Sequence, residues 1–274
     1  MTKSRIAWTE RVWNPVTGCT KVSAGCKNCY AERIAHRYWG ERKFTDVQTH
    51  PDRLDAPLHW RKPSRVFVNS MSDLFHEDVP DEFIAQIFGV MARATRHTFQ
   101  VLTKRPERME TLMIDGDWKR RVLVDAGISP PENWDSQEFA NRDWLCGNVW
   151  LGVSVENQEQ AEKRIPSLLQ TPAAVLWLSV EPMLGPVNFG LDLKTLKIGL
   201  EIYRGVDWVV VGGESGHGFR PMEIKWLESV VGQCRESCIP VFVKQDSGLR
   251  PGQQGRIPNH LWIKQYPEAT HELR

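Results

Sequence analysis

The sequence predicts an α/β fold, namely a partial β/α barrel of the TIM type with an N-terminal loop that carries three cysteines. After residue 65, short apolar runs without polar alternation recur, and segments with helical spacing separate them. Such runs indicate strands buried on both faces, and their alternation with helices indicates parallel pairing through right-handed crossovers. The loop is predicted by Cys19, Cys26 and Cys29, which fall within eleven residues.

The apolar runs give the strands in chain order. A first strand is expected near residues 6–13, before the cysteines, and six more at 66–69, 98–103, 149–154, 175–180, 208–212 and 240–244. Helical spacing predicts helices at 81–96, 106–113, 158–169 and 223–237. Pro80 and Asp81 open the first of these helices and Pro106 opens the second, as helix starts prefer.

Length and composition predict one ordinary enzyme-sized domain. With 274 residues and 41% hydrophobic content, the chain can bury a sizeable core, and we expect a single domain over 1–274. No apolar run approaches ~18 residues and no secretory segment follows the first residues, so we expect a cytoplasmic protein without a membrane partner. Residues 114–148 exceed the loop expected there and predict an insertion within the barrel.

Basic residues concentrate at the N-terminus although the net charge is only +1. Residues 1–65 hold thirteen Lys and Arg against six Asp and Glu, and they surround the cysteines as a basic, cluster-binding segment. Tryptophans and a tyrosine are interleaved there: Trp8, Trp13, Tyr38, Trp39 and Trp60. This pattern is typical of a surface that holds phosphates and stacks bases, and equally of a solvated helix face with tryptophans in the core.

The three cysteines predict a soft metal centre, because an odd number of neighbouring thiols cannot pair off as internal disulfides. One alternative is a closed zinc site in which His36 supplies the fourth ligand. A second is a 4Fe-4S cluster that leaves one iron open for S-adenosylmethionine, as in enzymes that cleave this molecule reductively. The first gap, with six residues between Cys19 and Cys26, departs from their usual spacing. A third alternative is unliganded cysteines in a loop.

Polar residues follow the predicted strands, and in barrels of this kind the site lies at the C-terminal strand ends. Turn chemistry explains Ser, Asn and Gly at such positions, but charges that converge on one mouth cost desolvation unless they hold a ligand or one another. We therefore expect a ligand site. The expected catalytic residues are Lys104, Glu181, Lys244 and Asp246; those expected to bind a cofactor are Tyr30, Asn69, Ser154, Glu156, Gly212, Gly213 and Glu214.

Chemistry assigns more specific roles to some of these residues. The turn 212–214 offers carbonyls and a carboxylate to the amino group of S-adenosylmethionine. Ser154 and Glu156 suit ribose hydroxyls, and Lys104 or Arg105 suits the carboxylate of its methionine part.

Several motifs together resemble a known family. They are Trp13-Asn-Pro-Val-Thr-Gly-Cys19, Cys26-Lys-Asn-Cys-Tyr-Ala31, and the runs at 102–106, 150–156, 179–183 and 211–216. They look like the three-Cys-motif family of phage and bacterial proteins, largely a domain of unknown function, over nearly the whole chain. Members are similar to radical S-adenosylmethionine enzymes, including distantly the lyase that repairs spore photoproduct. The resemblance implies a 4Fe-4S cluster on the three cysteines.

Three hypotheses follow. The first is a radical S-adenosylmethionine enzyme, which needs an electron donor and forms a deoxyadenosyl radical that acts on a nucleic-acid base or nucleotide. The second is a zinc-stabilised nucleic-acid-binding protein without catalysis. The third is a metal-free barrel hydrolase that uses Glu156, Glu181 and Glu214 as acid and base.

Overall fold

A seven-stranded parallel sheet organises the protein. The structure is a computed structural model that describes residues 4, 6–132, 134–136, 146–190, 193, 195–198 and 201–268. In spatial order, the strands of the sheet are β1 (Arg11–Trp13), β4 (Arg65–Val68), β5 (Thr98–Thr103), β6 (Val149–Ser154), β7 (Val175–Val180), β10 (Trp208–Val211) and β11 (Val241–Val243).

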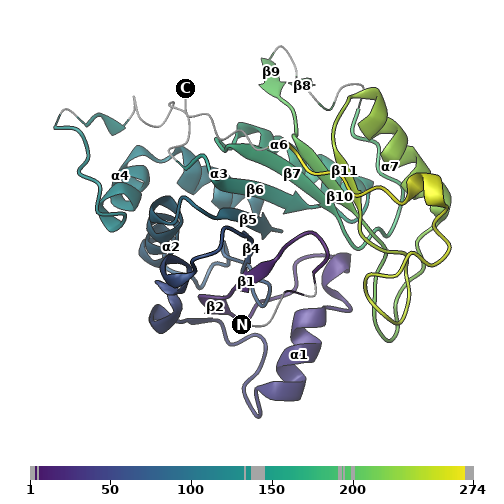
Figure 1. The fold of residues 1–274 in the computed structure, drawn as a ribbon, viewed down its shortest axis with the longest axis horizontal. Coiled ribbons are helices and arrows are strands. Elements are labelled where there is room, and N and C mark those ends of the chain that lie inside the picture. Colours follow the sequence, from purple (N-terminus) through teal and green to yellow (C-terminus); the bar gives the residue numbers. More distant parts are fainter. Residues whose placement is uncertain are drawn as a thin grey trace.

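The spatial order of these strands follows their order along the chain, so every connection runs in the same direction around the sheet. The sheet is curled and forms a half-barrel, with helices along its outer side (Figure 1). This confirms the partial barrel expected from the sequence, and the seven predicted strands coincide with the seven observed ones.

Four of the helices correspond to those predicted, and they are α2 (Asp81–Arg93), α3 (Pro106–Ile114), α6 (Gln158–Gln170) and α7 (Ile224–Glu236). Local chemistry sets where they begin. Pro106 occupies the first turn of α3, where a missing N–H costs nothing. Asn157 caps α6, since its side chain accepts from the backbone N–H of Gln160 at 3.1 Å.

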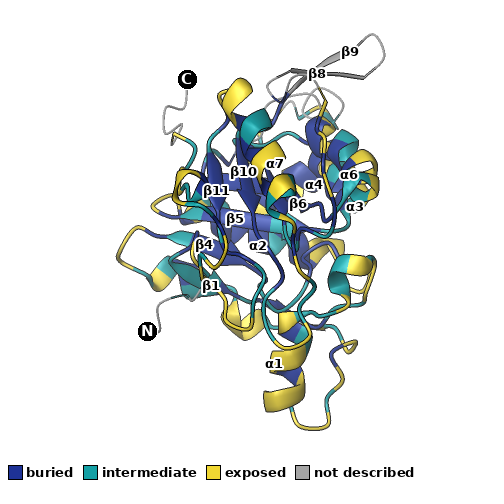
Figure 2. Cartoon of the chain, turned by 90° about the vertical axis from the view of Figure 1, so that its right-hand side faces the viewer, coloured by how far each residue is buried: buried dark blue, intermediate teal, exposed yellow. Residues whose placement is uncertain are grey.

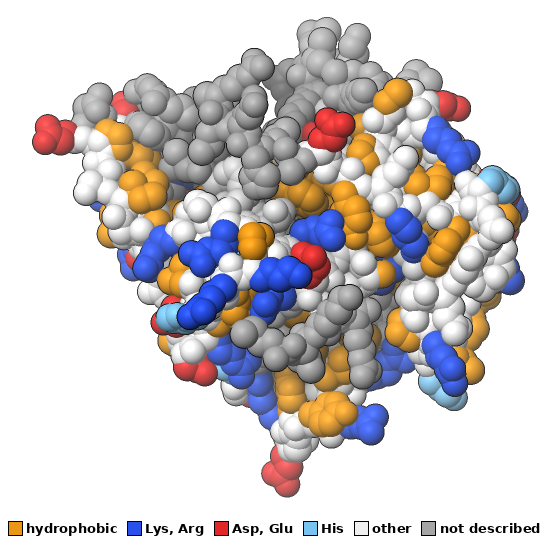
Figure 3. Space-filling view, viewed as in Figure 1, with side chains coloured by type: hydrophobic (Ala, Val, Ile, Leu, Met, Phe, Trp, Pro, Cys, Tyr) orange, Lys and Arg blue, Asp and Glu red, His pale blue; other side chains and the backbone are white. Residues whose placement is uncertain are grey.

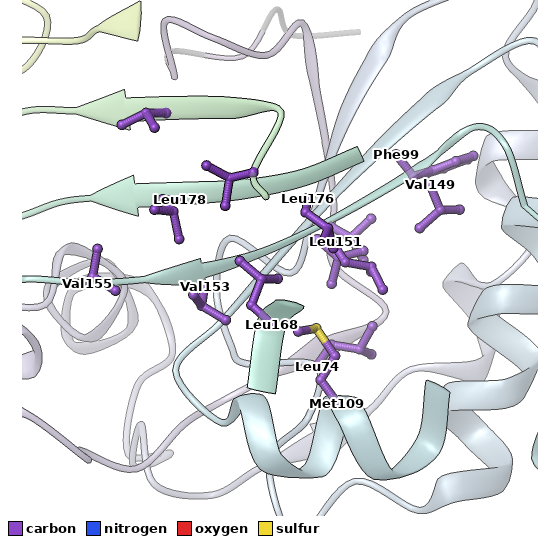
Figure 4. Close-up of a cluster of buried hydrophobic side chains, with 14 of the residues drawn as sticks. Leu74, Phe99, Met109, Val149, Leu151, Val153, Val155, Leu168, Leu176 and Leu178 are labelled. Atoms are coloured by element: carbon purple, nitrogen blue, oxygen red, sulfur yellow. The ribbon is translucent and has the colours of Figure 1, made fainter. Parts of the chain in front are cut away.

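The main core lies between the sheet and these helices. Strand residues at alternate positions, such as Leu151 and Val153 of β6, point to the helices and pack against Leu168 of α6 and Met109 of α3 (Figure 4). All four side chains are fully buried. Because the intervening positions must face the other way, the same strands deliver a second set of side chains to the concave side of the half-barrel.

An aromatic plug fills the concave side toward the N-terminal ends of the strands. It consists of Trp8, Phe67, Trp150, Val175, Trp177, Trp208, Val210 and Phe242. The rings meet mostly edge to face, with Trp8 and Trp177 at a centroid distance of 5.3 Å. Burial corrects one sequence interpretation: Trp8 in the plug and Trp13 in the main core are 2% and 3% exposed, so their rings are not available to stack on bases.

Residues 18–47, which we call the arm, leave the sheet between β1 and β4. The short antiparallel pair β2 (Val16–Thr17) and β3 (Gln48–Thr49) joins the two ends of the arm. The arm contains the three cysteines, a 3-10 turn (Ala24–Cys26) and helix α1 (Tyr30–Tyr38). Figure 2 shows that α1 projects from the body of the protein and is largely exposed, whereas the strands are buried.

Two further elements were not predicted. Helix α4 (Gly116–Asp125) lies in the segment interpreted as an insertion and packs against α2; residues 133 and 137–145 of that segment lie outside the described residues. The hairpin β8 (Thr195–Ile198) and β9 (Glu201–Arg204) separates β7 from β10. Among the helices of the described residues, none has the length and apolar character needed to cross a membrane.

Candidate functional site

A cavity of about 250 Å³ lies at the C-terminal ends of the strands, beneath the arm. Cys19, Cys26 and Cys29 line it from the arm side. Trp8 and Phe67, at the top of the aromatic plug, line it on the opposite, apolar side. The cavity is therefore bounded by thiols on one side and by aromatic rings and polar strand ends on the other.

The alternation of the strands explains which side chains reach this cavity. The lining residues Asn69, Lys104, Ser154, Glu181 and Lys244 each stand an even number of positions after a residue on the concave side of the same strand. Side chains in a strand alternate between faces, so every second residue lies on the concave side. The earlier ones bury the tryptophans of the plug, and the later ones bring these polar groups to the cavity at the C-terminal ends of the strands.

The cysteine thiols fit a soft metal centre in their chemistry. All three are free of disulfides and line one cavity. No group of three or more His, Cys, Asp and Glu in the described part of the chain is preformed around a metal ion. His36 is exposed on α1 and is not among the lining residues, so the Cys3His set is not assembled. Three thiolates are the ligands that an iron–sulfur cluster prefers.

Arg105 connects the end of β5 to the first cysteine. Its Nη1 lies 3.7 Å from Cys19 Sγ and 3.3 Å from Asp73 Oδ2, and its Nη2 donates to Thr20 Oγ1 at 2.8 Å. Burial and the nearby Asp73 carboxylate raise the pKa of the Cys19 thiol to about 12, and Arg105 opposes that rise. Arg105 is thus placed to compensate a thiolate at position 19.

Glu156 anchors the cysteine loop from below. Its carboxylate is fully buried and meets Lys104 Nζ at 3.2 Å, Arg164 Nη1 at 3.0 Å and the Ser23 hydroxyl, which donates to it at 2.8 Å. Burial alone would raise its pKa, but the two cations hold the pKa below its usual value. Gly25 lies directly above, and a Cβ there would come within 2.2 Å of Glu156 Oε1, so only glycine allows this approach.

Glu214 anchors the other side of the same loop. Asn28 Nδ2 donates to its Oε2 at 2.9 Å, and the guanidinium of Arg220 pairs with both carboxylate oxygens. Arg220 also donates to the carbonyl of Ala24 at 2.9 Å. Burial raises the pKa of Glu214, but hydrogen bonds from Arg220 and Asn28 outweigh burial and lower it. The two carboxylates therefore hold the cysteine loop over the strand ends.

Two amines stand on the cavity wall with their partners. Lys104 Nζ donates to Ser154 Oγ at 2.5 Å, and that hydroxyl donates to the carbonyl of Glu181 at 3.0 Å. Lys244 Nζ lies 3.0 Å from Glu181 Oε1. Both lysine side chains are 22% exposed, which keeps them accessible from the cavity. The amide Nδ2 of Asn69 is buried and has no hydrogen-bond partner among the described residues.

The structure brings eleven of the fourteen predicted site residues to one cavity. They are Cys19, Cys26, Cys29, Tyr30, Asn69, Lys104, Ser154, Glu181, Gly213, Glu214 and Lys244. Glu156, Gly212 and Asp246 are not among the lining residues. The carboxylate of Asp246 is buried and accepts from the guanidinium and the backbone N–H of Arg256, so it holds the 246–256 loop in place.

Packing requires glycine at positions 212 and 213, whether or not these residues contact a ligand. A Cβ on Gly213 would lie 2.3 Å from the backbone nitrogen of Ser247, and one on Gly212 would lie 2.8 Å from Glu181 Oε1. The glycines thus allow the ends of β10 and β11 to approach closely.

Sequence reasoning missed the partners of these groups. Asp73 accepts from Thr103 Oγ1 at 2.7 Å and from the backbone N–H of Lys104 at 2.9 Å. Asp73 lies in the polar run after β4. Because polar residues after the other strands were predicted to form the site, this position could have identified Asp73 as well. Arg164 and Arg220 gave no such signal, because they come from a helix and a loop and reach the site only through folding.

Comparisons with known proteins place the chain in a family but name no activity. A family model described as "Protein of unknown function (DUF5131)" matches residues 3–271. A search of the curated proteins gave no match. A search of the solved structures gave none either.

Proposed function

The chain belongs to the DUF5131 family, whose description assigns no function, so its activity has to be inferred from the site; we propose that it is a radical S-adenosylmethionine enzyme with a 4Fe-4S cluster on Cys19, Cys26 and Cys29. One observation carries the proposal. Three free thiols and the polar ends of several parallel strands line the same cavity, above an apolar floor of ring faces.

Cys19, Cys26 and Cys29 would hold the cluster, whose chemistry, with an electron from a separate donor, would be the one-electron reduction of S-adenosylmethionine to methionine and a deoxyadenosyl radical able to remove a hydrogen atom from the substrate. The protein's own groups hold and shield the reactants. The residues suited to S-adenosylmethionine are those on the wall beside the cysteines, namely Asn69, Lys104, Ser154, Gly213 and Lys244. The amines would take its carboxylate, and the buried Asn69 amide offers a donor that no described residue of the protein uses.

The anchors of the loop support a positioning role for the carboxylates. Glu156 and Glu214 hold the cysteine loop through Ser23 and Asn28. A cluster on this loop would then have a fixed orientation toward the cavity, as the second layer of a metal site generally requires. The ribose contact assigned to Glu156 is not part of the proposal, because that carboxylate lies beneath the loop and is saturated by protein donors.

The two other hypotheses receive less support from the geometry. A Cys3His zinc site would need His36 at the cavity, and that residue is exposed elsewhere on α1. A hydrolase needs a carboxylic acid that can hold a proton near neutral pH. The lowered pKa values of Glu156 and Glu214 keep both ionised and paired with cations, so neither of these two carboxylates is suited to act as the acid.

The test is anaerobic purification followed by iron and sulfide analysis, electron paramagnetic resonance and a dithionite-driven assay for deoxyadenosine. We expect a brown protein with about four irons per chain and deoxyadenosine production. Replacing the three cysteines by Ala should remove the iron and the deoxyadenosine.

Cys238→Ser is the matched control, because Cys238 is exposed and does not line the cavity. It should keep both iron and activity. A colourless protein that holds one zinc, or an iron-loaded protein that forms no deoxyadenosine, would overturn the proposal. The triple variant should remain folded by circular dichroism, since the sheet core contains none of the three cysteines.

A further inference from the structure

The arm carries a surface that the proposed reaction does not use. Helix α1 buries Ala31 and Ala35 against the arm's small core with Phe44, and much of its remaining surface, the outer side, faces solvent. On that outer side, Tyr30 is 45% exposed and Tyr38 is 69% exposed. Large apolar side chains left in water on one helix face, beside charged residues, mark an interaction site.

Basic and apolar side chains form two adjacent stripes on this outer face. At 100° per residue, Arg33, Arg37, Tyr30, Ile34 and Tyr38 fall in that angular order within an arc of about 140°. All five are exposed. The guanidinium of Arg37 lies 5.4 Å from the centroid of the Tyr38 ring. In Figure 3, a hydrophobic and a basic side chain lie side by side near the lower end of the molecule, where α1 lies, above an acidic side chain at the tip.

The charge of the arm is opposite to that of the rest of the chain. Residues 18–47 contain six Lys and Arg and three Asp and Glu, which leaves 29 against 31 elsewhere. Two of the three acids are neutralised within the arm, because Glu32 pairs with Lys21 at 2.8 Å and Asp46 with Arg42 at 3.2 Å. The arm therefore presents a net positive surface to a partner, whose charge should be negative.

The surface is continuous with the cavity. Tyr30 and Arg33 line the cavity as well as belonging to the outer face of α1. The Tyr30 hydroxyl donates to the Ser70 carbonyl at 2.6 Å, so the orientation of its ring is restricted. Tyr38 follows Tyr30 by eight positions in the helix, which places their Cα atoms about 12 Å apart. A chain that reaches the cavity can thus lie along α1 and meet both rings.

We propose that the arm binds single-stranded nucleic acid, with bases stacked on Tyr38 and Tyr30 and phosphates held by Arg37. The partner must be anionic and must offer flat apolar faces at intervals, and an unpaired strand has both properties. A duplex has the charge but hides the faces of its bases. An acidic protein has the charge but no regular series of flat faces to match two exposed tyrosines flanked by arginines.

The role of the arm in catalysis rests on the proposed function, because a strand on α1 would present one nucleotide to the cavity of the radical enzyme. Binding itself does not rest on it. The groups proposed to bind a strand are side chains of the arm itself. Their affinity for a strand can therefore be measured without S-adenosylmethionine and without turnover.

The experiment is fluorescence anisotropy with the full-length protein, prepared with and without the reconstituted cluster. The probes are labelled DNA and RNA single strands of about 12 nucleotides and the matching DNA duplex. We expect the single strands to bind more tightly than the duplex. Tyr38→Ala should weaken their binding about tenfold. Arg37→Gln should weaken it and reduce the slope of log affinity against log salt by about 0.7 to 1.

Arg93→Gln and Val124→Ala are the matched controls, since Arg93 on α2 and Val124 on α4 are exposed outside the arm and should bind like wild type. Failure of single strands to bind, equal affinity for the duplex, or equal loss in the controls would overturn the inference. Strand binding by a protein that forms no deoxyadenosine would overturn the proposed reaction alone. Deoxyadenosine formation by a protein that ignores single strands would overturn the role of the arm alone.

Discussion

Arg105 Nη1 lies 3.7 Å from Cys19 Sγ and joins the end of β5 to the first cysteine of the arm. The same guanidinium pairs with Asp73 and hydrogen-bonds to Thr20. One side chain therefore fixes the position of the loop and adds a positive charge beside a thiol that would be a metal ligand.

Replacing Arg105 should weaken metal binding, although of the three thiols Arg105 contacts only that of Cys19. We expect Arg105→Gln to lower iron affinity by about 10- to 100-fold, as losses in the second layer of metal sites do, and to make the cluster harder to reduce. Arg105→Lys should recover part of the lost reduction potential, because lysine restores the positive charge but not the several N–H donors of the guanidinium. Iron titration and redox potentiometry measure both effects. Arg121→Gln, which removes an exposed arginine that pairs with Asp125 on α4, should change neither, and equal effects there would contradict the role of Arg105.

Adding one methyl group at Gly25 should lift the cysteine loop from the barrel. A Cβ there would come within 2.2 Å of Glu156 Oε1, and this carboxylate cannot move away because Lys104 and Arg164 hold it. Gly25→Ala should therefore lose bound iron while the thermal unfolding midpoint of the barrel changes little. Gly232→Ala is the control, since it lies within α7 with open space around the added Cβ and should stabilise the protein by about 0.5 to 1 kcal/mol. Normal iron content in Gly25→Ala would show that the loop is not held at this point.

The carboxylate anchors predict an acid-sensitive fold. The pKa values of Glu156 and Glu214 are lowered in the folded state from the ordinary value of 4.5. The stability that they provide is therefore present above pH 4.5 and is lost as the pH falls through the lower, folded-state pKa. Urea unfolding between about pH 6 and about pH 3 should show midpoints that fall steeply in the acidic part of that range. Glu214→Gln should give a shallower fall, and an unchanged slope would count against its ion pair with Arg220.

The aromatic plug should set the stability of the half-barrel without setting its metal chemistry. Trp208 is fully buried and contacts Trp150, Trp177 and Tyr266 at ring-centroid distances of 5.7, 5.4 and 5.5 Å. Trp208→Ala should destabilise the protein by about 3 to 5 kcal/mol, because it leaves a large cavity in a packed core. Chemical denaturation measures the loss. Iron binding per folded molecule should be unchanged. A loss of iron that parallels the loss of stability would mean that the packing of the aromatic plug affects the cysteine loop.

The sequence by itself determined the sheet. Buried parallel strands have a simple signature, because apolar runs such as 175–180 must be apolar on both faces, and all seven predicted strands are present. The strand-end rule also located most of the site: once the strands were known, their parity directed Asn69, Ser154 and Lys244 to one mouth. Helix α1 was not predicted, because its nine residues combine two small buried alanines with an exposed polar and aromatic face.

Only the tertiary structure decided what each polar group does there. The sequence predicted both Glu156 and Lys244 as site residues. In the structure Glu156 is buried beneath Gly25, whereas Lys244 lines the cavity. Arg105 and Arg220 acquire their roles from partners 86 and 196 residues away in the chain. Strand alternation is a local property that depends on a few neighbouring residues, so a sequence displays it. The pairing of a buried charge depends on which distant side chain can reach it, and that is settled only when the arm lies over the barrel.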